Sequence, residues 1–279
     1  MTVAPPAASP DRTAQLADTR AAFDSVAVDY DGPRGNNELI QDMRAETWRW
    51  LDRAFPSPAR LLELGCGTGI DAVREAGRGH SVLATDWSAS MVERTRERAA
   101  AAGVDGRLET RLLGAHELER LAGGPPFDGV YSNLGPLNCV PDLGAVAHEC
   151  ARLVRPGGRL LFTVIGRLCP WEIAHYALRG RGARIAVRFR RGTVAVGMNG
   201  RTIWTRYYTP REFLAPFSAD FAREHVRGLC AFAPPPYLAG IRSRTPRLYR
   251  ALWAVDRRVA GWPLARSMGD HFLVVLRRR

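Results

Sequence analysis

Short apolar runs alternate with amphipathic segments through the first part of the chain. The runs that predict strands lie at 61–64, 81–86, 107–113, 127–133 and 159–165. The segments that predict helices lie between them, at 71–76, 89–102 and 143–153. Strands that alternate with helices of this length are typical of a parallel sheet covered by helices on both faces. The pattern therefore predicts an α/β fold.

After Gly166 this alternation ends. Helices are predicted over 171–187, from Pro210 and over 247–260, and strands over 202–208 and 271–276. We expect residues 1–20 to form a disordered tail and residues 21–166 to form the core of the domain. Residues 167–279 are expected to hold an inserted segment on the substrate side, basic helices and the last strands of the same sheet.

The composition is that of a globular chain, with 46% apolar and 24% charged residues. No run approaches the roughly 20 apolar residues of a membrane-spanning helix. Residues 1–10 lack the basic start and apolar run of a signal peptide. The five cysteines are scattered, with no CxxC pair or Cys/His cluster. This predicts reduced thiols, no metal site and a cytoplasmic protein.

The charge is distributed unevenly along the chain. Residues 167–279 carry 22 arginines and six acids, a net +16, whereas residues 1–166 carry a net −4. From Arg242 to Arg266 the arginines are interleaved with leucines and tryptophans, as in helices that lie at a membrane interface. The candidate partners are an anionic membrane surface, nucleic acid or a phosphorylated acceptor. A packed helix with a solvated arginine face would give the same pattern.

A glycine-rich turn follows the first predicted strand. In Glu63-Leu-Gly65-Cys66-Gly67-Thr-Gly69 the glycines allow a tight turn and a close approach of the backbone to a ligand. The next helix begins with free N–H groups. Asp86, at the end of the next strand, lies 21 positions after Gly65. This spacing is typical of an acid that binds ribose hydroxyl groups at the carboxyl edge of an open sheet.

These segments resemble class I S-adenosylmethionine-dependent methyltransferases. Residues 61–70 resemble the first motif of this family, 83–91 the second, 127–133 the fourth, and 153–160 the segment before the fifth strand. The resemblance covers about residues 23–165. It implies a Rossmann-like, mostly parallel sheet of seven strands, with an insertion after the fifth strand, and S-adenosylmethionine as the cofactor.

The resemblance also implies roles for individual residues. Asp86 would hold both ribose hydroxyl groups, and Trp87 and Met91 would pack on the adenine. The methionine part would face the glycine loop, with Asn133 and Leu134 beside the sulfonium. The loop residues that this assigns to the cofactor are Glu63, Gly65, Cys66, Gly67 and Gly69.

Two further features bear on the cofactor. Residues 23–31 resemble the N-terminal lid of the branch that methylates quinones and other small molecules, in which a tyrosine at the position of Tyr30 covers the cofactor. The family often has an acid after the third strand that contacts the adenine amino group, but here the sequence is Leu113-Gly114-Ala115-His116. The backbone of Ala115 or the side chain of His116 would then serve instead.

Other functions fit the sequence less well. The fingerprint of nicotinamide dehydrogenases is GxGxxG, and the third glycine here comes one residue early. A chain without lysine also lacks their Tyr-x-x-x-Lys. The Asn/Asp-Pro-Pro-Tyr and Pro-Cys motifs of nucleic-acid methyltransferases are absent. The acceptor is therefore expected to be small and hydrophobic, methylated on oxygen, nitrogen or carbon.

A general base is needed for some of these acceptors. The first candidate is His175, in the insertion between Trp171 and Tyr176. Tyr207 and Tyr208 are the others, and because side chains alternate along a strand only one of them can face the cleft. The alternative function is an RNA-interacting methyltransferase, or a protein that binds the cofactor without turnover.

Overall fold

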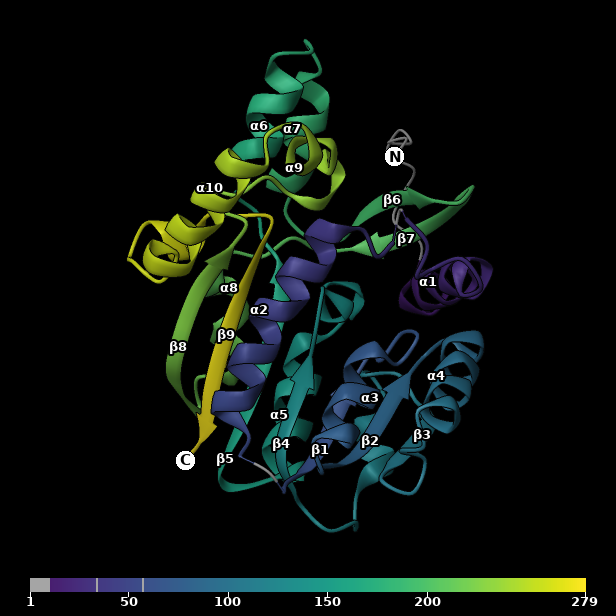
Figure 1. Cartoon of the computed structure of the whole chain (residues 1–279). Helices are drawn as coiled ribbons and strands as arrows, with labels where there is room; N and C mark the ends of the chain where they lie inside the picture. The colour runs from purple at the N-terminus through teal and green to yellow at the C-terminus, as the bar shows by residue number, and fades with distance from the viewer. Residues whose placement is uncertain (1–10, 34, 57) are drawn as a thin grey trace.

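The computed structural model describes residues 11–279 except positions 34 and 57. A seven-stranded sheet with strand order β3-β2-β1-β4-β5-β9-β8 forms its centre (Figure 1). The strands of this sheet are β1 Arg60–Leu64, β2 Ser81–Asp86, β3 Leu108–Leu112, β4 Phe127–Ser132, β5 Val154–Ile165, β8 Phe221–Leu229 and β9 His271–Arg278. Strand β9 runs antiparallel to the other six strands, which are parallel to one another. The predicted α/β fold with a mostly parallel seven-stranded sheet is confirmed.

Helices cover both faces of this sheet. Beside the sheet lies a hairpin of β6 Val194–Met198 and β7 Arg201–Thr205. The helices are α1 Arg12–Val26, α2 Glu38–Ala54, α3 Ile70–Gly77, α4 Ala89–Ala101, α5 Leu143–Leu153, α6 Pro170–Ala177, α7 Gly182–Phe189, α8 Pro210–Leu214, α9 Gly240–Arg244 and α10 Pro246–Val259. The 3₁₀ turns are η1 Leu118–Leu121, η2 Pro136–Cys139, η3 Ala215–Phe217, η4 Pro236–Leu238 and η5 Ala265–Ser267. None of the described helices has both the length and the apolarity that crossing a membrane demands.

The alternation of side chains along the strands divides the core between the two faces. One face is covered by α2, which packs Met43 and Leu51 on alternate residues of β1, β4, β5 and β9. Phe55, the residue after the helix, packs on the same face. On the other face, α5, α8 and η3 cover the intervening residues, with Phe213 and Phe217 against Phe162. The helix α2 therefore lies along the sheet, as Figure 1 shows, and its first turns reach the carboxyl ends of β1 and β4.

The antiparallel strand β9 determines what lies at this edge. Ile165, the last residue of β5, pairs with His271, the first residue of β9. The start of β9 is therefore at the same edge as the ends of β1, β2, β4 and β5. Because ligands of open α/β sheets bind at the carboxyl ends of the strands, residues at the start of β9 join that site.

The structure corrects the sequence prediction at the N-terminus. Residues 12–20, expected within a disordered tail, form the first part of α1, and the Asp11 side chain caps this helix by accepting from the Ala14 N–H. The helix is held by tertiary contacts rather than by a strong amphipathic pattern, since it packs on β7 and α4. Residues 1–10, the remainder of the predicted tail, lie outside the described residues.

The predicted helix over 171–187 is also wrong as a single element. It is broken into α6 and α7 by a turn in which Gly180 has a φ of +65°. The elements α2, β6 and β8 were not predicted. Strand β8 is interrupted by charged residues on its exposed side and carries a register shift between Arg223 and His225, which hides its alternation.

Candidate active site

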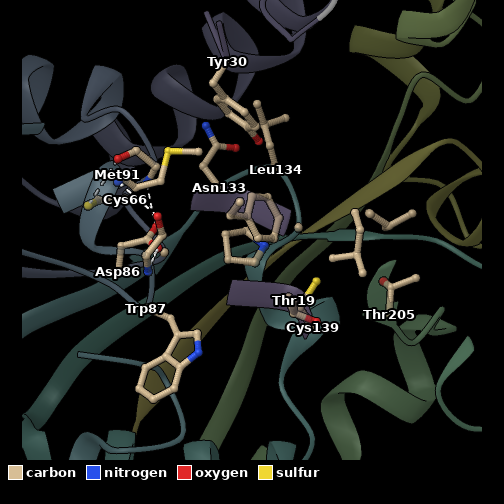
Figure 2. Close-up of a pocket in the computed structure, with 18 of the residues that line it drawn as sticks. Thr19, Tyr30, Cys66, Asp86, Trp87, Met91, Asn133, Leu134, Cys139 and Thr205 are labelled. Carbon is tan, nitrogen blue, oxygen red and sulfur yellow. Dashed lines mark hydrogen bonds between the residues drawn. The ribbon is translucent and has the colours of Figure 1, made fainter. Parts of the chain in front are cut away.

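A cavity of about 450 Å³ lies over the carboxyl edge of the sheet. One wall is formed by the glycine loop with the ends of β2 and β3, and a second by the start of α2 with the ends of β4 and β5. The roof is made by α1 and the β6–β7 hairpin. In Figure 2, Cys66, Asp86 and Met91 lie on one side of the cavity, and Cys139 and Thr205 lie on the other. This volume is within the range of sites for small molecules.

The glycine loop after β1 can exist only with glycines at two of its positions. Gly65 and Gly69 have φ of +72° and +82°. A Cβ at Gly65 would come within 2.3 Å of Pro136, and one at Gly69 within 2.9 Å of the Thr95 backbone. The loop therefore lies tightly between η2 and α4. Gly65, Cys66 and Gly67 line the cavity, whereas Gly69 precedes α3 as its N-cap and lies outside the cavity wall.

Asp86 ends β2 with its carboxylate held by the backbone. Oδ2 accepts from the Gly67 N–H at 2.9 Å, and Oδ1 accepts from the Ser88 N–H at 2.9 Å. Burial raises the pKa of Asp86, and these N–H groups act against that rise. The carboxylate is thereby fixed at the cavity wall, with lone pairs left to accept hydrogen bonds from a ligand's hydroxyl groups.

An aromatic and apolar slot adjoins Asp86. The rings of Trp87 and His116 meet edge to face, with centroids 4.4 Å apart. A Cβ at Gly114 would lie 2.2 Å from the His116 ring, so glycine makes this packing possible. Met91, Leu113 and Ala115 complete the slot. Glu117 accepts from the Gly114 N–H and does not line the cavity, so no acid replaces the one that is absent after the third strand.

A polar cluster around Asp71 forms the floor between the loop and α2. The carboxylate of Asp71 forms an ion pair with Arg44 and accepts from Trp48 Nε1 at 2.6 Å and from Asn133 Nδ2 at 3.0 Å. Thr163 Oγ1 donates to Asn133 Oδ1 at 2.9 Å. Arg44, Asp71 and Asn133 all line the cavity. Arg44 and Asp71 were not predicted, because their partners are distant in sequence.

Contrary to the prediction, Glu63 does not face the cavity. It is 1% exposed and accepts from the Tyr131 hydroxyl at 3.2 Å, and burial raises its pKa well above the usual value. The strand alternation places it under α2, on the same side of the sheet as Leu61. It supports the floor from below and is not part of the cavity wall.

The roof joins two segments that are far apart in sequence. Thr19 Oγ1 accepts from the Trp204 N–H at 3.1 Å, and Asp18 accepts from Trp204 Nε1 at 2.9 Å. These bonds hold α1 on β7. Figure 1 shows the helix beside the β6–β7 hairpin. Tyr30 also lines the cavity, and its ring lies about 4.0 Å from the Cβ position of Gly67. Burial raises the pKa of Tyr30, so its hydroxyl stays neutral over the loop.

The structure separates the three candidate bases. Tyr207 lines the cavity, but burial raises its pKa to about 12. Tyr208 is wrong as a site residue, because it packs in the core with its ring centroid 5.6 Å from that of Phe213. His175 is also wrong, because α6 directs its ring toward Tyr176 and Tyr237 outside the cavity wall.

The cavity wall also contains residues that the sequence did not single out. Apart from Arg44 and Asp71, the polar ones include Thr19, Ser88, Cys139, Thr205, Asp270 and His271. Ser88 lies within the segment 83–91 that resembles the second motif, but that resemblance implies no role for its side chain. The others lie in the N-terminal helix, in the η2 turn, in the insertion and at the start of the last strand, where no motif marks them. Across residues 11–279 without positions 34 and 57, no three histidine, cysteine or acidic side chains gather as metal ligands would.

Comparison with known proteins agrees with this geometry. Residues 61–158 match the methyltransferase domain family. The ubiquinone biosynthesis O-methyltransferase of Xanthomonas axonopodis pv. citri is 31% identical over 171 residues, which are 61% of this chain and 67% of that protein. The enzyme of the same name from Xylella fastidiosa strain 9a5c is 31% identical over 173 residues, 61% of this chain and 65% of that protein. For this relative the chain therefore spans less than two thirds of its length.

Solved structures of methyltransferases share the fold. Geranyl diphosphate C-methyltransferase from Streptomyces coelicolor A3(2) superimposes with a TM-score of 0.59 and 14% identity, over 98% of this chain and 100% of that one. The 1,6-didemethyltoxoflavin-N1-methyltransferase of Burkholderia thailandensis superimposes with a TM-score of 0.58 and 20% identity, over 99% of this chain and 93% of that one. The chain belongs to the class I S-adenosylmethionine-dependent methyltransferases. Within this class, the curated relatives above are O-methyltransferases of ubiquinone biosynthesis.

The Asp71 cluster predicts a large effect on stability. Asp71→Asn is expected to lower the free energy of unfolding by about 3–5 kcal/mol, because it leaves Arg44 buried without an anionic partner. Urea denaturation measures this change. The matched control is Glu93→Gln, which removes an exposed ion pair with Arg96 on α4 and is expected to cost less than about 1 kcal/mol. Equal losses in the two variants would show that the cluster has no special role.

Proposed function

We propose that this protein transfers the methyl group of S-adenosylmethionine to a small, hydrophobic acceptor. The observation that carries the proposal is the single cavity that joins two unlike halves. One half contains the glycine loop, Asp86 and the Trp87 slot. The other half is mostly apolar and lies between α2, the β6–β7 hairpin and the start of β9.

The first half fits S-adenosylmethionine residue by residue. The Asp86 carboxylate would accept from both ribose hydroxyl groups. Trp87 and Met91 would enclose the adenine, and the backbone of Ala115 or the ring of His116 would meet its edge. This fit rests on the cradle at Gly114 and Gly65, where any Cβ would collide with the slot or with η2.

The methionine part would lie between the loop and the floor. The backbone of Gly65, Cys66 and Gly67 would approach it closely, with Asn133 and Leu134 on its other side. Arg44 is the cation at this end and would attract the carboxylate. Tyr30 would cover the ligand from the roof. When bound, S-adenosylmethionine supplies an electrophilic methyl group, and the chain binds, orients and excludes water around the two reactants.

The second half supports a hydrophobic acceptor. Its apolar wall is formed by Ile40, Met43, Leu134, Ile165, Val196 and Ile203. The curated relatives are named ubiquinone biosynthesis O-methyltransferases. The structural relatives are named for transfer to carbon and to nitrogen. A quinone-like or other lipid-like small molecule fits this wall.

Cofactor binding is the first test. Native protein is expected to bind S-adenosylhomocysteine in calorimetry, and Asp86→Ala is expected to bind it about 10- to 100-fold more weakly, the effect of losing hydrogen bonds to a charged group. Asp105→Ala, which removes an exposed acid before β3, is the control and should bind like the native protein. No binding by the native chain, or equal binding by Asp86→Ala, would refute the assignment.

The acceptor class is the second test. Protein incubated with methyl-labelled S-adenosylmethionine and a cell extract is expected to place the label in a small molecule soluble in organic solvent, because the acceptor half is apolar. Mass spectrometry identifies the product, and Asp86→Ala provides the blank. Label that appears in RNA instead would favour the RNA-interacting alternative, and label in protein would contradict the proposed acceptor class.

We also propose that α10 places the protein on an anionic lipid surface. The buried side of α10 is anchored by Tyr249, which donates to Asp42 at 2.6 Å, and by Asp256, which accepts three backbone N–H groups of residues 231–233. Its outer side, here called the α10 surface, consists of Arg247, Leu248, Arg250, Val255, Arg257 and Arg258, with Trp262 and Leu264 following the helix. Trp262 is 65% and Leu264 84% exposed.

The charge of the α10 surface favours anionic lipid as its partner. Its arginines form no ion pair with any described acid, so their charge is available. Exposed apolar side chains among arginines suit the headgroup region of a bilayer, where the rings and methyl groups enter and the cations stay outside. A hydrophobic acceptor dissolved in a membrane would then be within reach of the protein.

Vesicle sedimentation tests this surface. The protein is expected to bind vesicles of phosphatidylglycerol and phosphatidylcholine at low salt and to bind pure phosphatidylcholine poorly. Leu248→Ser combined with Trp262→Ser should reduce the binding several-fold, whereas Leu112→Ser, an exposed apolar residue of β3, should not. Indifference to anionic vesicles, or tighter binding to single-stranded RNA than to vesicles, would contradict the proposal.

A further inference from the structure

A buried ion-pair network lies at the start of β9, beside the acceptor half of the cavity. Arg188 of α7 forms ion pairs with Asp270 at 2.6 Å and with Glu172 of α6 at 2.8 Å. It also donates to the backbone carbonyl of Gly166 at 2.8 Å. Asp270 in turn holds Nδ1 of His271 at 2.9 Å. The network thus leads from the insertion to one histidine ring.

The position of His271 is set by the sheet. It pairs with Ile165 at the end of β5, so it lies at the same edge as Asn133 and the glycine loop. It shares a face of β9 with Leu273 and Val275, which pack against α2. The residue is only 8% exposed and lines the cavity, as do Asp270 and Tyr207. The ring therefore faces the space assigned to the acceptor.

The partners of the ring define its tautomer. Although burial disfavours a charged carboxylate, Arg188 and His271 hold the pKa of Asp270 well below its usual range. An ionised carboxylate only accepts hydrogen bonds, so Nδ1 carries the proton of the neutral ring. Nε2 then has a free lone pair, and no described residue donates to it. Asp270 would also stabilise the cation that forms if Nε2 takes up a proton.

The other titratable groups of this half are less suited to accept a proton. Burial raises the pKa of the Tyr207 hydroxyl to about 12 and that of the Cys139 thiol to about 12, so both are neutral and weakly basic at neutral pH. Asp71 is occupied by three donors. The charged and titratable groups that act on the network itself are Arg188, Glu172, Cys169, Tyr207, Cys230 and Tyr237.

We propose that His271 is the general base that deprotonates a hydroxyl acceptor, with Asp270 and Arg188 as its positioning residues. This inference rests on the function proposed above and narrows it to O-methylation of a phenol-like hydroxyl. The proton moves from the acceptor oxygen to Nε2 as the new O–C bond forms. The C–S bond of the bound cofactor breaks, and S-adenosylhomocysteine leaves as a neutral thioether. The proton is later released from Nε2 to water.

Kinetics of His271→Gln test this role. The probe is a 1,2-dihydroxybenzene with a short prenyl chain, and the label transferred from S-adenosylmethionine is measured. His271→Gln is expected to lower kcat by about 10²- to 10⁴-fold, the usual contribution of a general base. His271→Phe, which keeps the ring volume, is the second variant if glutamine impairs folding.

The control separates a chemical role from a structural one. His175→Gln, on α6 outside the cavity wall, should retain the native kcat. His271→Gln should still bind S-adenosylhomocysteine within about threefold of the native protein, because the ring is outside the cofactor half. If the native protein does not bind S-adenosylhomocysteine, the proposed function is refuted. Normal binding together with an unchanged kcat in His271→Gln would refute the base alone.

A second readout needs no acceptor. In the native protein with S-adenosylhomocysteine bound, the nitrogen-15 NMR spectrum of the neutral His271 ring is expected to show its proton on Nδ1, which faces the Asp270 carboxylate. A neutral ring that carries its proton on Nε2 has no lone pair there to accept a proton and would overturn the inference.

Discussion

The carboxylate of Asp71 connects the parts of the protein that form the site. It lies in the first turn of α3, directly after the glycine loop, and binds Arg44 and Trp48 of α2 and Asn133 at the end of β4. A buried carboxylate needs such partners, since leaving it or Arg44 unpaired would cost several kcal/mol. These bonds set the distance between the loop and α2, and hence the floor of the cavity.

The segment after β5 adds residues of the β6–β7 hairpin to the wall of the cavity above this floor. The β6–β7 hairpin lies on α1, and Trp204 fastens the two by bonding Thr19 and Asp18. The lid is therefore made by the beginning of the chain and by the insertion together. This arrangement gives the cofactor half and the acceptor half a common roof, so that both reactants can be enclosed away from water.

The same insertion reaches the sheet through Arg188. Its guanidinium group joins α6, α7 and the start of β9, and it is nearly fully buried between Asp270 and Glu172. The antiparallel direction of β9 matters here, because a parallel last strand would place its first residue at the opposite edge of the sheet. The network instead ends on His271 at the cavity. The insertion thus supports the chemistry proposed for this residue as well as the shape of the acceptor half.

The sequence by itself determined the α/β fold, the cofactor class and most of the cofactor half of the cavity. These follow from local rules: strand periodicity, the glycine spacing from Gly65, and an acid 21 residues later at Asp86. Each depends on residues close together in the chain. The loop residues Cys66 and Gly67, the Trp87 slot and Tyr30 accordingly line the cavity.

Only the tertiary structure decided which side chains face the acceptor. Choosing between Tyr207 and Tyr208 required knowing on which side the core lies. Excluding His175 required knowing that its ring lies against Tyr176 and Tyr237, outside the cavity wall. Arg44, Asp71 and His271 have no local signature. Their partners lie on other elements, and His271 reaches the site through the direction of β9. Pairing across a sheet depends on strand order, and no periodicity within a single segment encodes it.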